Sequence, residues 1–134
     1  PAQVKTLTLE DSAMVKFGRV APQFGVKDIQ KAIDFWVEAL GFEVTFTNGN
    51  PVCFSVLKKD DSEIHIKLDP ERAGKGHCHI LVEGLDDFFK AYQATGHKVI
   101  QPPKLQSWGM KDAVLADSDG NTVEVAERIV SPLS

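Results

Sequence analysis

The sequence has few cysteines, no long apolar run and no excess of basic residues. Its 134 residues include two cysteines, Cys53 and Cys78, which predict free, reduced thiols and no disulfide framework or CxxC motif. No apolar run approaches the roughly 18 residues that span a bilayer. The first residues lack the basic, apolar, then small-residue order of a secretion signal. These absences favour a cytoplasmic protein that does not enter a membrane.

Nucleic-acid binding and two common kinds of catalysis also lack support. The net charge of −4 argues against nucleic acid, because phosphate binding needs clustered Lys and Arg. There is no Gly-rich phosphate loop and no local Ser-His-Asp signature. The chain has an ordinary globular composition, with 43% apolar and 25% charged residues, and the length of one domain. Its acidic balance is compatible with a cationic small-molecule ligand.

One helical pattern occurs twice along the chain. Residues 26–44, VKDIQKAIDFWVEALGFEV, and residues 82–99, VEGLDDFFKAYQATGHKV, carry apolar side chains at three- and four-residue spacing. Asp28 is a predicted N-cap of the first helix. Each pattern runs to a glycine, Gly41 or Gly96, which suits the left-handed residue that ends a helix. The sequence therefore predicts two related amphipathic helices.

Strand-like segments flank both helices in the same order. The first half contains RVAPQFGV before its helix and FEVTF, VCFSVL and EIHIKL after it; the second contains HCHILV, then HKVI, DAVLA and TVEVAE. Turn-forming runs separate them, including QPPKLQSWGMK and the hairpin signal Asp119-Gly120. The order predicts two βαβββ modules, at about 19–69 and 76–128, in a single domain of residues 19–134. Residues 1–18 are predicted to form an N-terminal arm.

Alternation within the strands places polar side chains on one face. Every second residue of EIHIKL, HCHILV and TVEVAE is apolar and is expected to pack on the helices. The opposite faces carry His65, Lys67, His77, His79 and Glu124. A surface that meets only bulk water has little need of three histidines, so these strands are predicted to wall a ligand cleft. The same alternation turns Cys78 toward the helices, which disfavours it as a nucleophile.

These modules, with VKDIQKAIDFWVEALGFEV and the closing LADSDGNTVEVAE, resemble the glyoxalase / bleomycin-resistance / dioxygenase superfamily, also called vicinal oxygen chelate proteins. Phe35-Trp36, Leu40-Gly41-Phe42 and SWGMKDAVLADSDGN are most similar to its bleomycin-resistance branch. The resemblance implies an α+β fold of two tandem βαβββ modules in a curled, cleft-enclosing mixed sheet, with helices outside. It also implies antibiotic resistance by a homodimer that sequesters a drug between its subunits, with no metal and usually with a swapped arm.

Enzymes of the same superfamily hold a divalent metal, and the resemblance implies where its ligands would lie. The positions on the first, fourth, fifth and eighth strands fall on Ala21, His65, His77 and Glu124. Alanine cannot coordinate a metal, and Gln23 lies about 7 Å further along the strand. The resemblance therefore favours no cofactor and assigns no catalytic residue. Zn, Ni, Mn or Fe on His65, His77 and Glu124, in a lyase, isomerase or dioxygenase, is the alternative. A regulatory domain with a vestigial cleft is a third hypothesis.

Aromatic residues complete the candidate ligand contacts. Trp108 lies in a long predicted loop, where an exposed ring can stack on a planar or cationic group; alternatively, it plugs the end of the barrel. Phe42 matches a cleft-lining aromatic of the resembled branch, and Phe54 lines the cleft or belongs to the core. The candidate ligand-binding residues are therefore Trp108, Phe42, Phe54, His65, His77 and Glu124. His97 follows the helix-ending glycine and is expected in a solvated turn.

Overall fold

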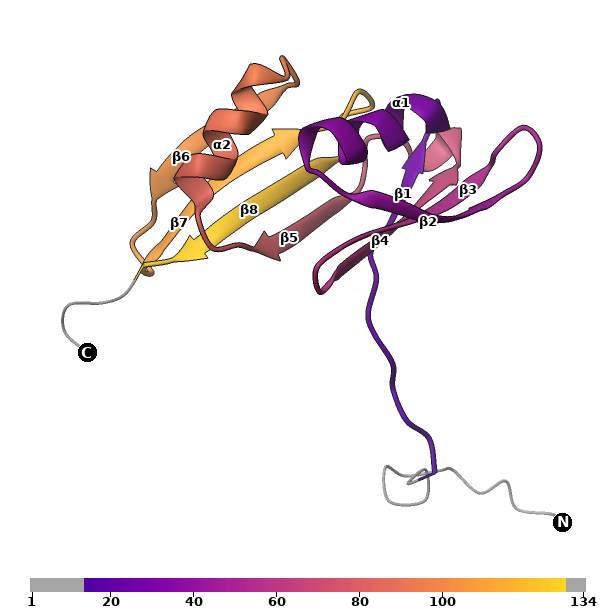
Figure 1. The fold of residues 1–134 in the computed structure, drawn as a ribbon, viewed down its shortest axis with the longest axis horizontal. Helices are drawn as coiled ribbons and strands as arrows, with labels where there is room; N and C mark the ends of the chain where they lie inside the picture. The colour runs from indigo at the N-terminus through magenta and orange to yellow at the C-terminus, as the bar shows by residue number, and fades with distance from the viewer. Residues whose placement is uncertain (1–13, 130–134) are drawn as a thin grey trace, which may run out of the picture.

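Two four-stranded mixed sheets, each with one helix, make up the computed structural model, which describes residues 14–129 (Figure 1). The first module contains β1 (Gln23–Val26), α1 (Ile29–Asp34), a π-helical segment η1 (Phe35–Ala39), β2 (Glu43–Asn48), β3 (Phe54–Lys59) and β4 (Ser62–Leu68). After a 3₁₀ turn, η2 (Pro70–Arg72), the second contains β5 (His77–Leu81), α2 (Leu85–Ala94), β6 (Val99–Leu105), β7 (Met110–Ala116) and β8 (Thr122–Arg128). The predicted α+β class and tandem βαβββ order are confirmed.

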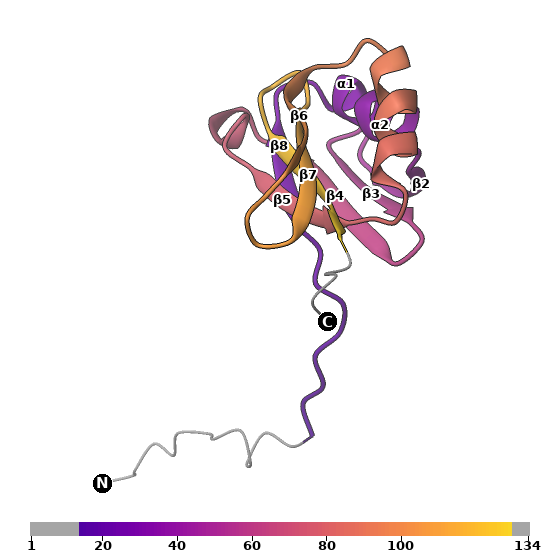
Figure 2. The ribbon, with the colours of Figure 1, turned by 90° about the vertical axis from the view of Figure 1, so that its left-hand side faces the viewer.

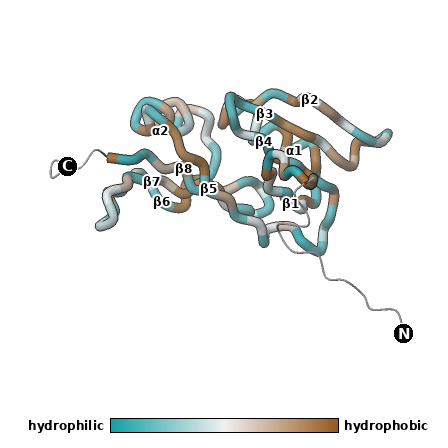
Figure 3. The backbone as a smooth tube through the Cα atoms, turned by 90° about the horizontal axis from the view of Figure 1, so that it is seen from below, coloured by the Kyte–Doolittle hydropathy of each residue, from teal (hydrophilic) through white to brown (hydrophobic). Residues whose placement is uncertain are grey.

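The two sheets repeat one topology. Sheet A has the order β1-β4-β3-β2 and sheet B the order β5-β8-β7-β6. The β1–β4 and β5–β8 pairs are parallel, because a helix and two strands separate their members, and the other pairs are antiparallel. Both helices lie toward the same side of the molecule, and the two modules lie side by side (Figures 1, 2 and 3). Each sheet therefore has one helix-covered face and one helix-free face.

The first predicted helix is shorter and less regular than its pattern. Asp28 caps it as expected, because its Oδ1 accepts a hydrogen bond of 3.1 Å from the backbone N–H of Lys31. The α-helical hydrogen bonding ends at Asp34 and continues as the π-helical segment η1. Gly41 then takes a φ of +77°, the left-handed conformation predicted for this stop. Apolar periodicity does not distinguish α from π hydrogen bonding, so the segment was not predictable from it.

Strand β6 is longer than the sequence pattern predicted. The run from Gln101 through Pro102 and Pro103 was expected to form a turn, but β6 continues to Leu105. Its pairing with β7 shifts register between Gln101 and Lys104. Proline is tolerated here because β6 is the outer edge of sheet B and a bulge interrupts the ladder. The loop that remains before β7 is short.

A buried asparagine joins the two modules. Asn121 is 2% exposed. Its Nδ2 donates to the carbonyl of Gly25 at 2.9 Å, and its Oδ1 accepts from the N–H of Gly76 at 2.8 Å. Gly76 has no room for a side chain, since an added Cβ would lie 2.6 Å from the ring of Phe24. Close packing and this amide thus hold β1 beside the start of β5.

The core is continuous across the modules. Buried apolar side chains of both helices and both sheets form one cluster, which includes Phe24, Trp36, Leu85 and Tyr92. The turn predicted at Asp119-Gly120 is confirmed, with a φ of +94° at Gly120. The predicted arm lies partly outside the described residues, which begin at Met14. No helix among residues 14–129 has the length and apolar character needed to cross a membrane.

Candidate ligand-binding site

The helix-free face of sheet B brings His77 and Glu124 together. Parallel pairing sets His77 beside Thr122 and His79 beside Glu124. The Thr122 hydroxyl lies 2.6 Å from His77 Nδ1, and the other ring nitrogen, Nε2, lies 3.8 Å from Glu124 Oε1. The hydroxyl therefore orients the imidazole so that Nε2 is turned toward the carboxyl group. This pair is the polar centre of the face.

Glu124 also has a carboxyl neighbour from β7. Asp112 is 3% exposed and accepts hydrogen bonds from Gln101 Nε2 at 2.8 Å and Gln106 Nε2 at 2.9 Å. Burial, followed by the hydrogen bond with Asp112, raises the pKa of Glu124. Burial of Asp112 acts in the same direction, but hydrogen bonds from Gln106, Glu124 and Gln101 outweigh it and lower the pKa of Asp112. Of the two carboxyl groups, Glu124 is therefore the one whose protonated form is favoured, because its pKa is raised and that of Asp112 is lowered.

His65 lies on the other sheet with a different set of partners. Its Nε2 is 2.9 Å from Glu63 Oε2, and Glu63 also pairs with Arg19 at 3.1 Å and Lys58 at 3.4 Å. The hydrogen bond with His65 is the largest of the effects that lower the pKa of Glu63. The ring of Phe54 meets His65 edge to face, with 5.5 Å between the ring centroids. Sheet A thus presents a histidine in an ion-pair and aromatic cluster.

The candidate metal ligands do not converge within one chain. His77 and Glu124 adjoin, whereas His65 is paired with Glu63 on the other sheet. Among residues 14–129, no three His, Cys, Asp or Glu side chains are grouped as a metal site requires. Ala21 precedes β1 and offers no ligand, and Gln23 pairs with His65. The residues of a single chain therefore do not fit a mononuclear divalent metal.

The predicted aromatic contacts occupy three different environments. Trp108 is 67% exposed in the loop between β6 and β7, so it does not plug the sheet. Phe54 lies on the helix-free face of sheet A, opposite Lys67 and 6.3 Å from the ring of Phe46. Phe42 is 5% exposed and packs edge to face on Trp36 at 4.9 Å, on the helix side. These three side chains do not line one cleft within the chain.

Cys78 and His97 test two predicted side-chain environments. Cys78 is half-buried against the core, and burial raises the pKa of its thiol to about 11, so it is a poor nucleophile. Its predicted orientation is confirmed. The expectation of a solvated turn for His97 is wrong, because the ring is half-buried and packs edge to face on Phe35, with 5.5 Å between ring centroids. The left-handed Gly96 reverses the chain and returns the side chain to the helices.

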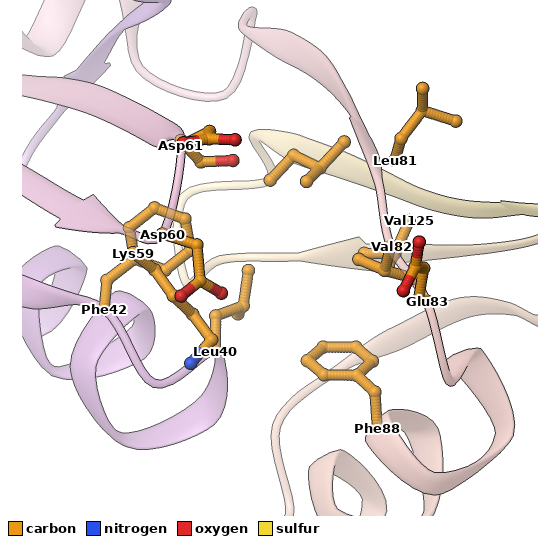
Figure 4. A pocket seen from close by; sticks show the side chains of 12 residues that line it. Leu40, Phe42, Lys59, Asp60, Asp61, Leu81, Val82, Glu83, Phe88 and Val125 are labelled. Atoms are coloured by element: carbon orange, nitrogen blue, oxygen red, sulfur yellow. The ribbon is translucent and has the colours of Figure 1, made fainter.

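A pocket between the modules, on the helix side, was missed by sequence reasoning. Its volume is about 620 Å³, and its apolar lining comprises Leu40, Phe42, Ile80, Leu81, Val82, Phe88 and Val125 (Figure 4). These residues come from the segment between η1 and β2, the end of β5 and the residue after it, α2 and β8. No local pattern links segments so far apart in the sequence. Only Phe42 among the predicted ligand contacts lies here.

Comparisons with known proteins agree with this architecture. The class of this protein is defined by its fold, two tandem βαβββ modules in which each sheet has one helix-free face. The model of the Glyoxalase/Bleomycin resistance protein/Dioxygenase superfamily matches residues 16–125, and the chain belongs to this superfamily.

Individual relatives point to one branch of it. A bleomycin resistance protein from Geobacillus stearothermophilus is 26% identical over 132 residues, covering 82% of this chain and 96% of the relative. The crystal structure of TioX from Micromonospora sp. ML1 has a TM-score of 0.74 at 16% identity, covering 84% of this chain and 100% of TioX. A bleomycin-binding protein complexed with bleomycin has a TM-score of 0.71 at 21% identity, covering 84% of this chain and 99% of that protein. At these identities, the structural likeness shows the fold.

Proposed function

We propose that the protein binds and sequesters a small molecule, a drug or a metabolite, as a homodimer of the bleomycin-resistance type. The observation that carries this proposal is the chemistry of the two helix-free faces. Phe46, on sheet A, is 54% exposed, and Leu81 on sheet B and Trp108 in the loop between β6 and β7 are exposed as well. Exposed apolar side chains, together with the polar pair His77 and Glu124 on sheet B, are typical of a surface that meets a ligand or another subunit.

The comparisons support a drug as ligand. The curated relatives are named bleomycin resistance proteins, and one structural neighbour is a bleomycin-binding protein complexed with bleomycin. In the proposed mode, Trp108 stacks on a planar or cationic part of the compound, while His77 and Glu124 supply polar contacts. Capture is stoichiometric, so protection depends on the concentration of the protein and involves no turnover.

A homodimer accounts for the division of the candidate residues between two sheets. His65 and Phe54 lie on sheet A, and His77 and Glu124 on sheet B. In the proposed dimer, the helix-free face of sheet A in one copy lies opposite sheet B of its partner. Each of two equivalent clefts then contains both halves of the set. The exposed Phe46 and Leu81 supply apolar area for such a contact.

One observation favours an enzyme as the second candidate. His77 Nε2 and Glu124 Oε1 are 3.8 Å apart, and Thr122 orients the imidazole. Imidazole and carboxylate are ligands of catalytic divalent metals, and a metal-bound histidine usually has its other ring nitrogen hydrogen-bonded, as His77 Nδ1 is to Thr122. Zn, Ni, Mn or Fe would supply Lewis-acid chemistry to a lyase, isomerase or dioxygenase. His77 and Glu124 provide two ligands, and a third would have to come from His65 of the second copy.

A titration separates these functions. Bleomycin is added to the purified full-length protein while tryptophan fluorescence and the melting temperature are followed. Of the two tryptophans, Trp36 is buried and Trp108 is exposed, so quenching that Trp108→Phe removes reports binding at the proposed face. We expect one bleomycin per cleft and a rise in melting temperature. An unchanged signal at saturating drug contradicts drug capture.

Metal is tested in the same preparation. Elemental analysis and thermal shifts with Zn²⁺, Ni²⁺, Mn²⁺ and Fe²⁺ are compared between the wild type and His77→Ala, with His97→Ala as a control whose imidazole lies on the helix side. A stoichiometric metal that only His77→Ala loses supports the enzyme and opposes simple sequestration. Drug binding without any effect of metal supports sequestration and opposes the enzyme.

A further inference from the structure

The pocket between the modules lies on the helix side, and of the residues assigned above to the helix-free faces it includes Leu81. Its walls come from the helix side, where Leu40 and Phe42 of the first module face Val82 and Phe88 of the second across the opening (Figure 4). His65, His77, Glu124 and Trp108 are not among its lining residues. Its volume of about 620 Å³ lies within the range of roughly 300–1,000 Å³ that is usual for small-molecule sites. The pocket is therefore large enough for a multi-ring compound.

The rim of this pocket is acidic. Asp60 and Asp61, in the turn between β3 and β4, and Glu83, between β5 and α2, place carboxylates on both sides of the opening. Within the part of the chain that the structure describes, none of these three side chains forms an ion pair. Lys59 is the cation among the lining residues. Like charges gathered at one opening repel each other, and a bound cation relieves this repulsion.

The apolar wall determines the rest of the ligand. Ile80 and Val125 belong to sheet B, Val82 directly follows β5, and the ring of Phe88 lines the same pocket from α2. An aromatic or aliphatic ring system buries its surface against such a wall, while its charge stays at the rim. An anion of the same shape would meet the three carboxylates. Shape and charge therefore select the same class of compound.

We propose that this pocket is a second small-molecule site, which takes a cationic amphiphile with its rings against Phe88 and Val82 and its positive charge between Asp60, Asp61 and Glu83. The site lies within one chain and needs no partner subunit. Apart from Leu81, its lining is distinct from the residues proposed for the helix-free faces, so one protein can hold two ligands. The proposal stands or falls separately from the drug-capture proposal above.

Two dyes that share one ring skeleton test whether the pocket prefers a cation to an anion. Rhodamine 6G is a cationic xanthene and fluorescein an anionic one, and the fluorescence anisotropy of each is titrated with the full-length protein. We expect rhodamine 6G to bind at least tenfold more tightly than fluorescein. Its affinity falls as salt is raised, because the rim is open to solvent. Equal affinity of the two dyes overturns the proposal.

Variants of the rim locate the dye. Asp60→Asn, Asp61→Asn and Glu83→Gln keep the side-chain shapes, and asparagine tolerates the positive φ of 50° at Asp60. Each single change is expected to weaken rhodamine 6G binding by about threefold to fivefold. Lys59→Gln is the matched control of opposite sign and is expected to tighten binding. A triple carboxylate variant that binds rhodamine 6G like the wild type overturns the proposal.

Two further variants separate the pocket from the other face. Val82→Phe fills the pocket and is expected to abolish rhodamine 6G binding; circular dichroism and a melting curve check that this variant folds. Trp108→Ala removes the exposed ring that the drug-capture proposal uses for stacking and is expected to leave rhodamine 6G binding unchanged. Loss of the dye in Trp108→Ala with retention in Val82→Phe places it on the helix-free face and refutes the second site. Bleomycin titrations of the same variants report the drug-capture proposal independently.

Discussion

The two modules share one topology but anchor their helices differently. The first helix is capped by its own sequence, because Asp28 accepts from the N–H of Lys31 three residues later. The second begins after Gly84, which has no side chain, and its cap is the carboxylate of Glu127 on β8. That carboxylate accepts from the N–H groups of Gly84 at 2.7 Å and Leu85 at 3.3 Å. A cap supplied from another strand also holds α2 against sheet B, so the same element order depends on local contacts in one module and tertiary contacts in the other.

The polar faces differ as well. On sheet A, Glu63 sits among His65, Arg19 and Lys58, which favour its charged form. On sheet B, Glu124 sits beside Asp112 and is partly shielded from water, which favours its protonated form. The folded state therefore lowers the pKa of one glutamate and raises that of the other. Repetition of a fold has not preserved the electrostatics of the faces.

The largest effect is expected where the two modules meet. Asn121→Ala removes the bonds to Gly25 and Gly76 and deprives a buried carbonyl and a partly buried N–H of this partner. We expect a loss of about 2–4 kcal/mol in the free energy of unfolding. Urea unfolding followed by circular dichroism measures it, with the exposed Ser118→Ala as control. A loss below about 0.5 kcal/mol would mean that packing alone joins the modules.

Removal of the remote cap comes next. Glu127→Ala deprives the first turn of α2 of its acceptor for two N–H groups. The expected loss is about 1–2 kcal/mol, because such a charged cap also complements the helix dipole. The same urea experiment measures it, and Glu127→Gln is expected to restore part of the stability. If Glu127→Ala unfolds like the wild type, water caps this helix equally well.

The local cap gives the smaller change of the two. Asp28→Ala removes one hydrogen bond, to Lys31, and is expected to cost about 1 kcal/mol. Asp28→Asn, which keeps an acceptor, is the matched control and should stay within a few tenths of a kcal/mol of the wild type. A loss in Asp28→Ala larger than in Glu127→Ala reverses the proposed contrast between the modules.

The smallest effects are opposite pH dependences of the two glutamates. The folded-state pKa of Glu63 is lowered, so its contribution to stability is present above its ordinary value of 4.5 and is lost as the pH falls. The folded-state pKa of Glu124 is raised, so its contribution is present below 4.5 and is lost as the pH rises through the folded-state value. Unfolding of Glu63→Gln and Glu124→Gln between pH 3 and pH 7 measures both. Relative to the wild type, Glu63→Gln should lose stability and Glu124→Gln gain it as the pH rises, and parallel curves contradict the assignment.

The order of strands and helices was predictable from the sequence because helical spacing and strand alternation are local properties of the chain. Alternation correctly turned Cys78 to the core and His77 to the helix-free face, and helical spacing identified both helices. The N-cap Asp28 was predictable for the same reason, since cap and helix are adjacent. The cap from Glu127 was not, because it joins residues that are far apart in the chain.

The sequence identified the residues of the candidate site but not which of them lie close together. Alternation along a strand assigns each of His65, His77 and Glu124 to one face of its own strand. It does not show which strands lie next to each other. The structure pairs β5 with β8, which joins His77 to Glu124, and leaves His65 on another sheet. The pocket between the modules depends on how two helices and two sheets pack, and no periodicity encodes that.

The prolines of β6 limit how copies of this chain can associate. β6 is the outer edge of sheet B, and Pro102 and Pro103 carry no N–H there. A strand from another molecule finds fewer donors along this border, so extension of the sheet by strand addition is disfavoured. The edge is thereby protected against open-ended aggregation. In the homodimer proposed above, contact between the two copies is therefore expected on the broad side of the sheet, where it closes on itself.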